Sequence, residues 1–387
     1  MYSTILFDVD GVMLCEEHYF NASALTVWEL LFSPRFLGLS PGALPAPSPD
    51  PDEETIQRVR EAVFAGDEVL DFMKRIGVNS NWDMVFFQFS CQLLDRLEAL
   101  REDGVAVADW LPETWDADQI RALGHRLAAH GRSGAKDGGA DFRSFVRRFA
   151  SCQGAGDLFA AIRDAFGRLK GPDPWPEAAM RSLWQVGRHT FQEWYLGDEY
   201  SGGPKTGKRG FVTREVPLAD PASMRRLFTR LREAGVRLGI ATGRPDIETR
   251  VPLTQLGLLS LFDPFGITTA SDVVRAEEQH PGARPLSKPN PFSYLRSYLG
   301  APDAGEVLSR PLPLPREEAA QVLVVGDSVA DWMAARAAGF DFAAVLTGLT
   351  GQAARSKFEE LGCEFILNDL AELERVLLDS VHTDAVR

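Results

Sequence analysis

Acidic side chains follow the first apolar run of the sequence. Residues 5–7 are Ile, Leu and Phe, Asp8 comes next, and Asp10 and Gly11 follow it closely. A short apolar run is typical of a buried strand, and a glycine permits the turn that both carboxylates need to reach one site. A carboxylate there could attack phosphorus as a nucleophile. The simpler interpretation is an ordinary Asp-Gly turn.

Three further polar segments come at the end of an apolar run or the start of a helical pattern. They are Ala241-Thr242-Gly243-Arg244-Pro245, Lys288-Pro289-Asn290-Pro291, and Gly326-Asp327-Ser328 with Asp331. Thr242 offers a hydroxyl and Gly243 a backbone N–H at a strand-to-helix junction, where donors collect around anionic oxygens. We expect these two residues to bind a phosphoryl group.

A phosphate among these carboxylates requires cations. Each close pair of like charges costs on the order of 4 kcal/mol at an effective dielectric near 20. Asp327, Asp8 and a backbone carbonyl of Asp10 form an oxygen-rich set that suits Mg²⁺. Lys288 supplies a second positive charge. Asp331 lies four residues after Asp327, so it can face the same site and hold a metal-bound water or Lys288.

In this order the segments resemble the four motifs of the haloacid dehalogenase-like hydrolase superfamily. The resemblance covers residues 1–15 and the chain from about residue 211 onward. It implies that Asp8 is the nucleophile, and that Asp10 protonates the leaving oxygen and then activates a water. The implied site consists of catalytic and phosphate-binding residues with three metal ligands and one supporting residue: catalytic Asp8, Asp10, Thr242 and Lys288; phosphate-binding Asp8, Thr242, Gly243 and Lys288; metal-binding Asp8, Asp10 and Asp327; supporting Asp331.

From residue 221 onward helical and strand patterns alternate. Such alternation predicts βαβ units and an α/β fold, a Rossmann-like doubly wound parallel sheet. We expect strands at 236–241, 265–269, 321–325 and 342–346, and helices at 224–234, 246–256, after Lys288, at 329–338 and at 370–378. In these sheets ligands bind beyond the carboxyl ends of the strands, where Asp8, Thr242 and Asp327 are expected.

The sequence between the first strand and this region is helical. Apolar residues at helical spacing predict helices at 22–31, 53–64, 82–100, 157–170 and 176–195, a proline-rich loop at 41–51 and a glycine-rich loop at 131–139. We therefore predict a catalytic core of residues 1–15 and 211–387, and an inserted helical cap of residues 16–210. Its position resembles the C1 class of the superfamily, although the insertion is larger than usual.

Composition excludes several classes of protein. A net charge of −14 and a pI near 5.0 argue against a broad nucleic-acid surface. The sequence lacks a run of about 18 apolar residues, so we expect no membrane span and a cytoplasmic location. The four cysteines are scattered and lack zinc-site spacing, which predicts neither disulfides nor zinc.

Residues for substrate specificity are harder to choose. The candidates are His18, Arg188, His189, Lys205, Lys208, Arg209 and Arg244. Residues 201–210 are glycine-rich, and we expect a hinge loop there, with a positive patch made by Lys205, Lys208 and Arg209, or else a solvated linker. The same stretch reads GxxxxGK, but Arg209 replaces the hydroxyl residue of a P-loop, which excludes that motif.

The most specific interpretation is a Mg²⁺-dependent phosphomonoester hydrolase that acts on a small phosphorylated metabolite through an aspartyl-phosphate. Asp10 favours a phosphatase over a dehalogenase, because a halide leaving group needs no acid. A phosphomutase and a non-catalytic binding protein remain alternatives.

Overall fold

The computed structural model describes residues 2–78, 80–131, 140–172, 175–300 and 303–379. The chain forms two compact units. Met1–Glu16 and Val212–Arg387 together make the first, which we call the sheet unit, and Glu17–Phe211 makes the second, the helical unit. In sequence, the helical unit is inserted between the first strand of the sheet unit and the rest of it.

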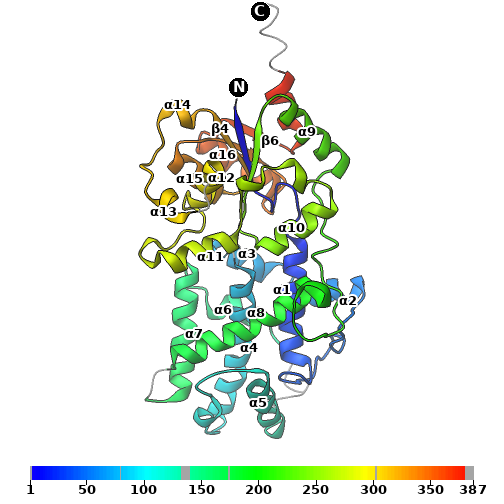
Figure 1. Ribbon diagram of the computed structural model, residues 1–387. Coiled ribbons are helices and arrows are strands. Elements are labelled where there is room, and N and C mark those ends of the chain that lie inside the picture. The colour runs from blue at the N-terminus through cyan, green and yellow to red at the C-terminus, as the bar shows by residue number, and fades with distance from the viewer. Residues whose placement is uncertain (1, 79, 132–139, 173–174, 301–302, 380–387) are drawn as a thin grey trace, which may run out of the picture. The chain divides into compact units, whose positions relative to one another are not determined.

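The sheet unit contains a six-stranded parallel sheet (Figure 1). Its strands, in the order β3-β2-β1-β4-β5-β6, are β3 (Ile267–Thr268), β2 (Arg237–Ala241), β1 (Thr4–Phe7), β4 (Val322–Gly326), β5 (Asp341–Val345) and β6 (Phe365–Leu367). Phe7 on β1 pairs with Ile240 on one side and with Val325 on the other. The predicted parallel sheet is confirmed, and the first strand of the chain lies in its middle.

Helices cover both faces of this sheet. Ile5 and Phe7 belong to one buried cluster, with α9 (Pro221–Glu233), whereas Leu6 belongs to another, with α12 (Phe292–Leu299) and α15 (Val329–Ala338). Successive side chains of a strand point to opposite faces, so a continuous apolar run such as 5–7 is expected where both faces are covered. The other helices are α10 (Asp246–Gln255), α11 (Ala270–Gln279), α13 (Ala304–Leu308), α14 (Arg316–Ala319), α16 (Arg355–Glu360) and α17 (Ala371–Glu374).

Some expected elements differ from the structure. The strand predicted at 265–269 is reduced to β3, because a 3-10 turn, Pro264–Gly266, occupies its first half. The helix predicted at 370–378 divides into α17 and a π-helical turn, Arg375–Asp379. Strand β6 was not expected, since three apolar residues are too few to show an alternating pattern.

The helical unit consists of eight α-helices among the described residues. They are α1 (Glu17–Phe32), α2 (Glu53–Val63), α3 (Glu68–Arg75), α4 (Asn81–Glu102), α5 (Ala117–Ala129), α6 (Ser144–Arg148), α7 (Ala155–Lys170) and α8 (Glu177–Tyr200). Helix α1 packs against α2, α4 and α8 and is buried on nearly every side. Residues 41–51 contain neither helix nor strand, as predicted, whereas the loop predicted at 131–139 lies outside the described residues after position 131.

Candidate active site

Three predicted site residues lie at the carboxyl ends of neighbouring strands. Asp8 directly follows β1, Thr242 follows β2 and Asp327 follows β4. The register of β1 with β2 and β4 brings these three ends to the same edge of the sheet. This is the edge at which ligands bind in open α/β sheets.

A tight turn follows Asp8. The amides of Met13 and Leu14 both donate to the carbonyl of Val9, at 2.9 and 3.0 Å. Gly11 has a φ of +70°, a conformation that glycine adopts without strain. A Cβ at this position would lie 2.2 Å from Oδ2 of Asp327, so only glycine fits between the turn and that carboxylate.

Lys288 links two of the carboxylates. Its Nζ lies 3.0 Å from Oδ1 of Asp8 and 2.7 Å from Oδ1 of Asp331. The lysine side chain is 14% exposed and that of Asp8 is 11% exposed. Lys288 therefore places a positive charge beside the proposed nucleophile, where the sequence predicted one.

Asp331 is the most completely bonded acid of the site. Its Oδ1 also accepts from the Tyr294 hydroxyl at 2.8 Å, and its Oδ2 accepts from the backbone and the hydroxyl of Ser328 at 3.2 and 2.6 Å. Ser328 and Asp331 form the capping box of α15. Asp331 thus holds Lys288 in place. Sequence reasoning missed Tyr294, although its place on the helix after Lys288 was a usable signal.

Asp327 is flanked by two glycines. A Cβ on Gly348 would lie 1.8 Å from Oδ2 of Asp327, closer still than the one on Gly11. Carboxylate oxygens of Asp8, Asp327 and Asp331 lie within 4.8 Å of one another. Hard oxygen ligands at this spacing fit a divalent cation such as Mg²⁺.

The charges of the site are unbalanced. Burial raises the pKa of Asp8 to about 7, Asp331 and Asp10 raise it as well, and Lys288 opposes them. Burial also raises the pKa of Asp327 well above its usual range, with further contributions from Asp331 and Asp8. For Asp331 burial acts in the same direction, but Lys288 outweighs it and lowers the pKa. A second cation would relieve the repulsion that remains.

Thr242 and Gly243 differ in exposure. Thr242 is buried, and its hydroxyl accepts from the amide of Arg244 at 3.1 Å. Gly243 is exposed, and no atom lies within 4 Å of the position its Cβ would take. Its backbone N–H therefore lies at an accessible point of the strand-to-helix junction, where an anion can approach.

The Asp10 side chain has a cationic partner. It binds Arg244, whose Nε and Nη2 lie 2.7 and 2.5 Å from Oδ1 of Asp10. Arg244 was expected among the substrate contacts, but its side chain is only 1% exposed and also pairs with Glu215. The structure corrects this prediction, and the partner Glu215 was missed because nothing in the sequence links it to Arg244.

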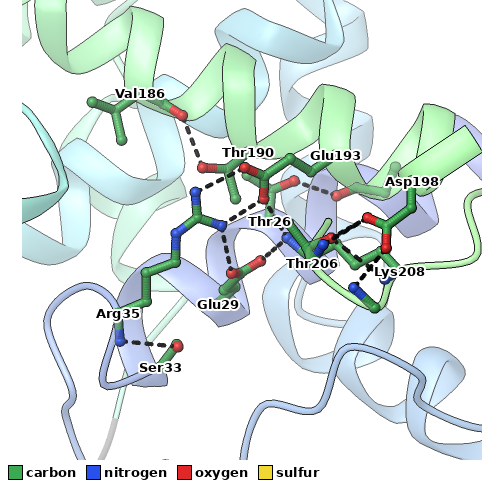
Figure 2. A network of polar contacts seen from close by, with 12 residues as sticks. Thr26, Glu29, Ser33, Arg35, Val186, Thr190, Glu193, Asp198, Thr206 and Lys208 are labelled. Carbon is green, nitrogen blue, oxygen red and sulfur yellow. Dashed lines mark hydrogen bonds and ion pairs between the residues drawn. The ribbon is translucent and has the colours of Figure 1, made fainter. Parts of the chain in front are cut away.

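A second charged cluster lies in the helical unit (Figure 2). Nζ of Lys208 lies 2.6 Å from Glu29 and 2.7 Å from Glu193, and Arg35 donates twice to Glu193, at 2.6 and 2.8 Å. We call these four residues the helical-unit cluster. The Lys208 side chain is 3% exposed. The positive patch expected at 201–210 is therefore wrong for Lys208.

The remaining specificity candidates have varied surroundings. Arg209 pairs with Asp50 at 2.5 Å at the surface, and Lys205 is exposed. Arg188 lies over the Trp82 ring at 4.7 Å, His18 lies beside Phe211 and His189 is exposed. None of these contacts indicates a substrate.

Sequence comparison identifies the class of protein that this fold and site define. A family model described as haloacid dehalogenase-like hydrolase matches residues 143–339, about half of the chain. The chain therefore belongs to the haloacid dehalogenase-like hydrolase family. The matched residues include Thr242, Lys288, Asp327 and Asp331. No curated protein matches the sequence.

The chain is also similar to solved structures. An X-ray structure of a Northeast Structural Genomics Consortium target is 33% identical, with a TM-score of 0.82, over 98% of this chain and 99% of that one. A predicted phosphoglycolate phosphatase from Haemophilus somnus is 14% identical, with a TM-score of 0.40, over 97% of both chains. The putative HAD-hydrolase YfnB from Bacillus subtilis, bound to magnesium, is 16% identical, with a TM-score of 0.36, over 97% of this chain and 98% of that one. The last two similarities are too low to bear on the function of this protein.

No helix in the described part of the chain is both long and apolar enough to cross a bilayer.

Proposed function

We propose that this protein is a Mg²⁺-dependent phosphomonoester hydrolase that acts on a small phosphorylated metabolite through an aspartyl-phosphate. The observation that carries the proposal is the position of Asp8. Its carboxylate is buried at the end of the central strand, 3.0 Å from the Lys288 ammonium and within 4.8 Å of Asp327 and Asp331. A nucleophilic carboxylate beside a fixed cation suits attack on a phosphate, whose negative charge must be neutralised before an anion can approach.

In the first step, an Asp8 oxygen attacks phosphorus and the bond from phosphorus to the leaving oxygen breaks. Asp10 gives a proton to that oxygen, so that an alcohol leaves. Lys288, the Thr242 hydroxyl and the Gly243 amide bind the transferred phosphoryl oxygens. The product of this step is a phosphoryl group covalently bound to Asp8.

In the second step, Asp10 takes a proton from a water as the water attacks phosphorus. The bond between phosphorus and Asp8 breaks and inorganic phosphate is released, which restores both carboxyl groups to their starting states. Asp10 acts as an acid in the first step and as a base in the second, so one residue serves both half-reactions.

Asp8 and Asp327 are the carboxylates that would hold Mg²⁺, with the backbone carbonyl of Asp10 as the third protein ligand. Bound there, the cation would neutralise phosphate charge and polarise a phosphoryl oxygen. Asp331 already accepts from Lys288, Tyr294 and Ser328, so we assign it a supporting role.

The helical unit, in this proposal, is a C1-type cap that selects the substrate. It is inserted in the chain directly after the strand and turn that carry Asp8 and Asp10. The sheet unit would carry out the chemistry, and the helices of the cap would recognise the rest of the metabolite.

The proposal is tested by measuring phosphate release from a panel of phosphorylated metabolites, with Mg²⁺ and with a chelator. Acid quench during turnover and mass spectrometry should find one phosphoryl group on the peptide that contains Asp8. A phosphomutase would give an isomerised product with little phosphate. Metal-independent release at full rate, or a phosphoryl group on another residue, would refute the mechanism.

A further inference from the structure

Arg244 is a buried cation that the chemistry proposed above does not use. Its side chain is 1% exposed, in a unit where most arginines lie at the surface. A guanidinium removed from water is stable only when its donors are paired with well-placed acceptors. The contacts of Arg244 therefore indicate its role in the protein.

Two of those contacts converge on one oxygen of Asp10. Nε and Nη2 lie 2.7 and 2.5 Å from the same Oδ1. Asp10 lies in the tight turn after β1, and its side chain is 23% exposed. The guanidinium therefore holds this carboxylate oxygen in place.

Glu215 fixes the other side of the guanidinium. Nη1 of Arg244 donates to Oε1 of Glu215 at 2.8 Å, and the Glu215 side chain is 2% exposed. The chain around Glu215 is bonded to the turn that carries Asp10. The Cys15 amide donates to the carbonyl of Val216 at 2.9 Å, and the Leu218 amide donates to that of Met13 at 3.0 Å.

Arg244 is also tied to the strand end on its own side. Its amide donates to the Thr242 hydroxyl at 3.1 Å, and its Nη1 approaches the carbonyl of Glu248 at 3.4 Å. The guanidinium is therefore held by Glu215 and by the strand end that carries Thr242. Of its two carboxylate partners, Asp10 is more exposed than Glu215.

We infer that Arg244, oriented by Glu215, is a positioning residue that sets the Asp10 carboxyl for proton transfer to the leaving oxygen. This inference rests on the proposed phosphatase function. Proton transfer requires the donor and the acceptor to be within hydrogen-bond reach in a fixed geometry, and an unrestrained carboxyl would meet the leaving oxygen in only some of its rotamers.

The leaving group provides a specific test. Phenyl phosphate has a poor leaving group that needs a proton, whereas 4-nitrophenyl phosphate has a better one that needs it less. We expect Arg244→Lys to lower kcat/KM for phenyl phosphate by about 10- to 100-fold and for 4-nitrophenyl phosphate by only about threefold or less. A merely structural role would lower both values by the same factor.

Two further variants keep the test decisive. Glu215→Gln should give a smaller change in the same direction, which covers the case in which Arg244→Lys does not fold. In the background of Asp10→Asn, Arg244→Lys should have almost no additional effect on phenyl phosphate, because both changes remove one function. Additive losses, or equal losses on both substrates in both variants, would overturn the inference.

Arg296→Lys is the matched control. Arg296 is also largely buried in the sheet unit and pairs with a carboxylate, Asp272, at 3.4 Å, but it does not belong to the proposed machinery. Any loss in this variant should be equal for both substrates. If Asp10→Asn changes the leaving-group dependence and Arg244→Lys and Glu215→Gln do not, the inference fails and the phosphatase stands. If the wild type releases no phosphate from any ester, both fail.

Discussion

The protein contains two clusters of charged side chains with opposite charge balance. In the sheet unit, oxygens of three carboxylates, those of Asp8, Asp327 and Asp331, lie within 4.8 Å of one another, and the Lys288 ammonium pairs with Asp8 and Asp331. In the helical-unit cluster, two carboxylates face two cations. The first arrangement has an excess of negative charge, whereas the second neutralises itself.

The pKa values reflect this difference. Burial raises the pKa of Asp8 to about 7 because Lys288 only partly compensates for it. Burial also acts to raise the pKa of Glu193, but Arg35 and Lys208 outweigh it and the pKa falls below its usual value. The acid-rich group is incomplete without a further cation, and the balanced one needs none. Charge balance, and not burial alone, therefore distinguishes a candidate site from a structural network.

The largest expected effect is at the nucleophile. Asp8→Asn should lower phosphate release by about 10⁴-fold or more, because an amide does not form the acyl phosphate. Circular dichroism should show an unchanged fold. Asp220→Asn is the control, because Asp220 caps α9 at the surface and asparagine is an equally good cap. Substantial turnover by Asp8→Asn, with contamination and deamidation excluded, would contradict the covalent mechanism.

Substitutions of the two acids Asp327 and Asp331 should have different effects. Asp327→Asn should raise the Mg²⁺ concentration needed for half-maximal activity by about tenfold to a hundredfold, because it removes a proposed ligand. Asp331→Asn should mainly lower stability, by about 1–3 kcal/mol, because it disturbs the bonds to Lys288 and Tyr294. Mg²⁺ titration of activity and urea unfolding distinguish the two. The same Mg²⁺ dependence in Asp327→Asn and wild type would remove Asp327 from the site.

The helical-unit cluster should respond to loss of its own balance. Lys208→Met removes a positive charge that neutralises Glu29 and Glu193. We therefore expect the free energy of unfolding, measured with denaturant, to fall by about 3–5 kcal/mol. Lys205→Met, an exposed neighbour, should change stability by no more than about 0.5 kcal/mol. Adding Glu193→Gln to Lys208→Met should recover part of the loss. Equal stability of both lysine variants would show that the cluster contributes nothing.

Acidity should weaken binding of the cation to the sheet-unit site. The folded-state pKa of Asp8 is about 7, above its usual value of 3.8. In the metal-free protein the proton on Asp8 therefore stabilises the fold fully below pH 3.8, and this stabilisation is lost as the pH rises through about 7. Mg²⁺ competes with that proton. Its apparent affinity should therefore be about tenfold weaker at pH 6 than at pH 8, as measured by the rise in Tm on Mg²⁺ titration. A rise in Tm that is independent of pH would contradict this.

The smallest effect should come from an exposed ion pair. Arg209 and Asp50 have side chains 64% and 52% exposed, so Arg209→Ala should cost less than about 1 kcal/mol. Because Arg209 is paired, its removal should also leave KM unchanged for phosphorylated substrates. A large and specific rise in KM would restore the hypothesis of a substrate-attracting loop.

The sequence predicted the sheet and the places of several candidate site residues in it, because these depend on short patterns. Asp8 and Asp327 follow apolar runs, and Asp331 is one helical turn from Asp327, so their positions follow from local geometry. The pairing of Arg244 with Asp10 and Glu215 joins residues distant in sequence, and no local pattern encodes it. Lys208 was misread for the same reason, since its carboxylate partner Glu29 lies on α1, far from it in sequence. The catalytic roles and the cap remain proposals.

The central place of β1 also has a consequence for how the protein is made. Thr4 pairs with Arg237 and with Val322, so both neighbours of this strand are translated long after it. At about 5–20 residues per second, the ribosome needs on the order of ten seconds or more to reach the first partner. During that time an apolar strand without a sheet is a ready binding segment for a chaperone. The proposed nucleophile therefore reaches its native surroundings only after β4 has left the ribosome.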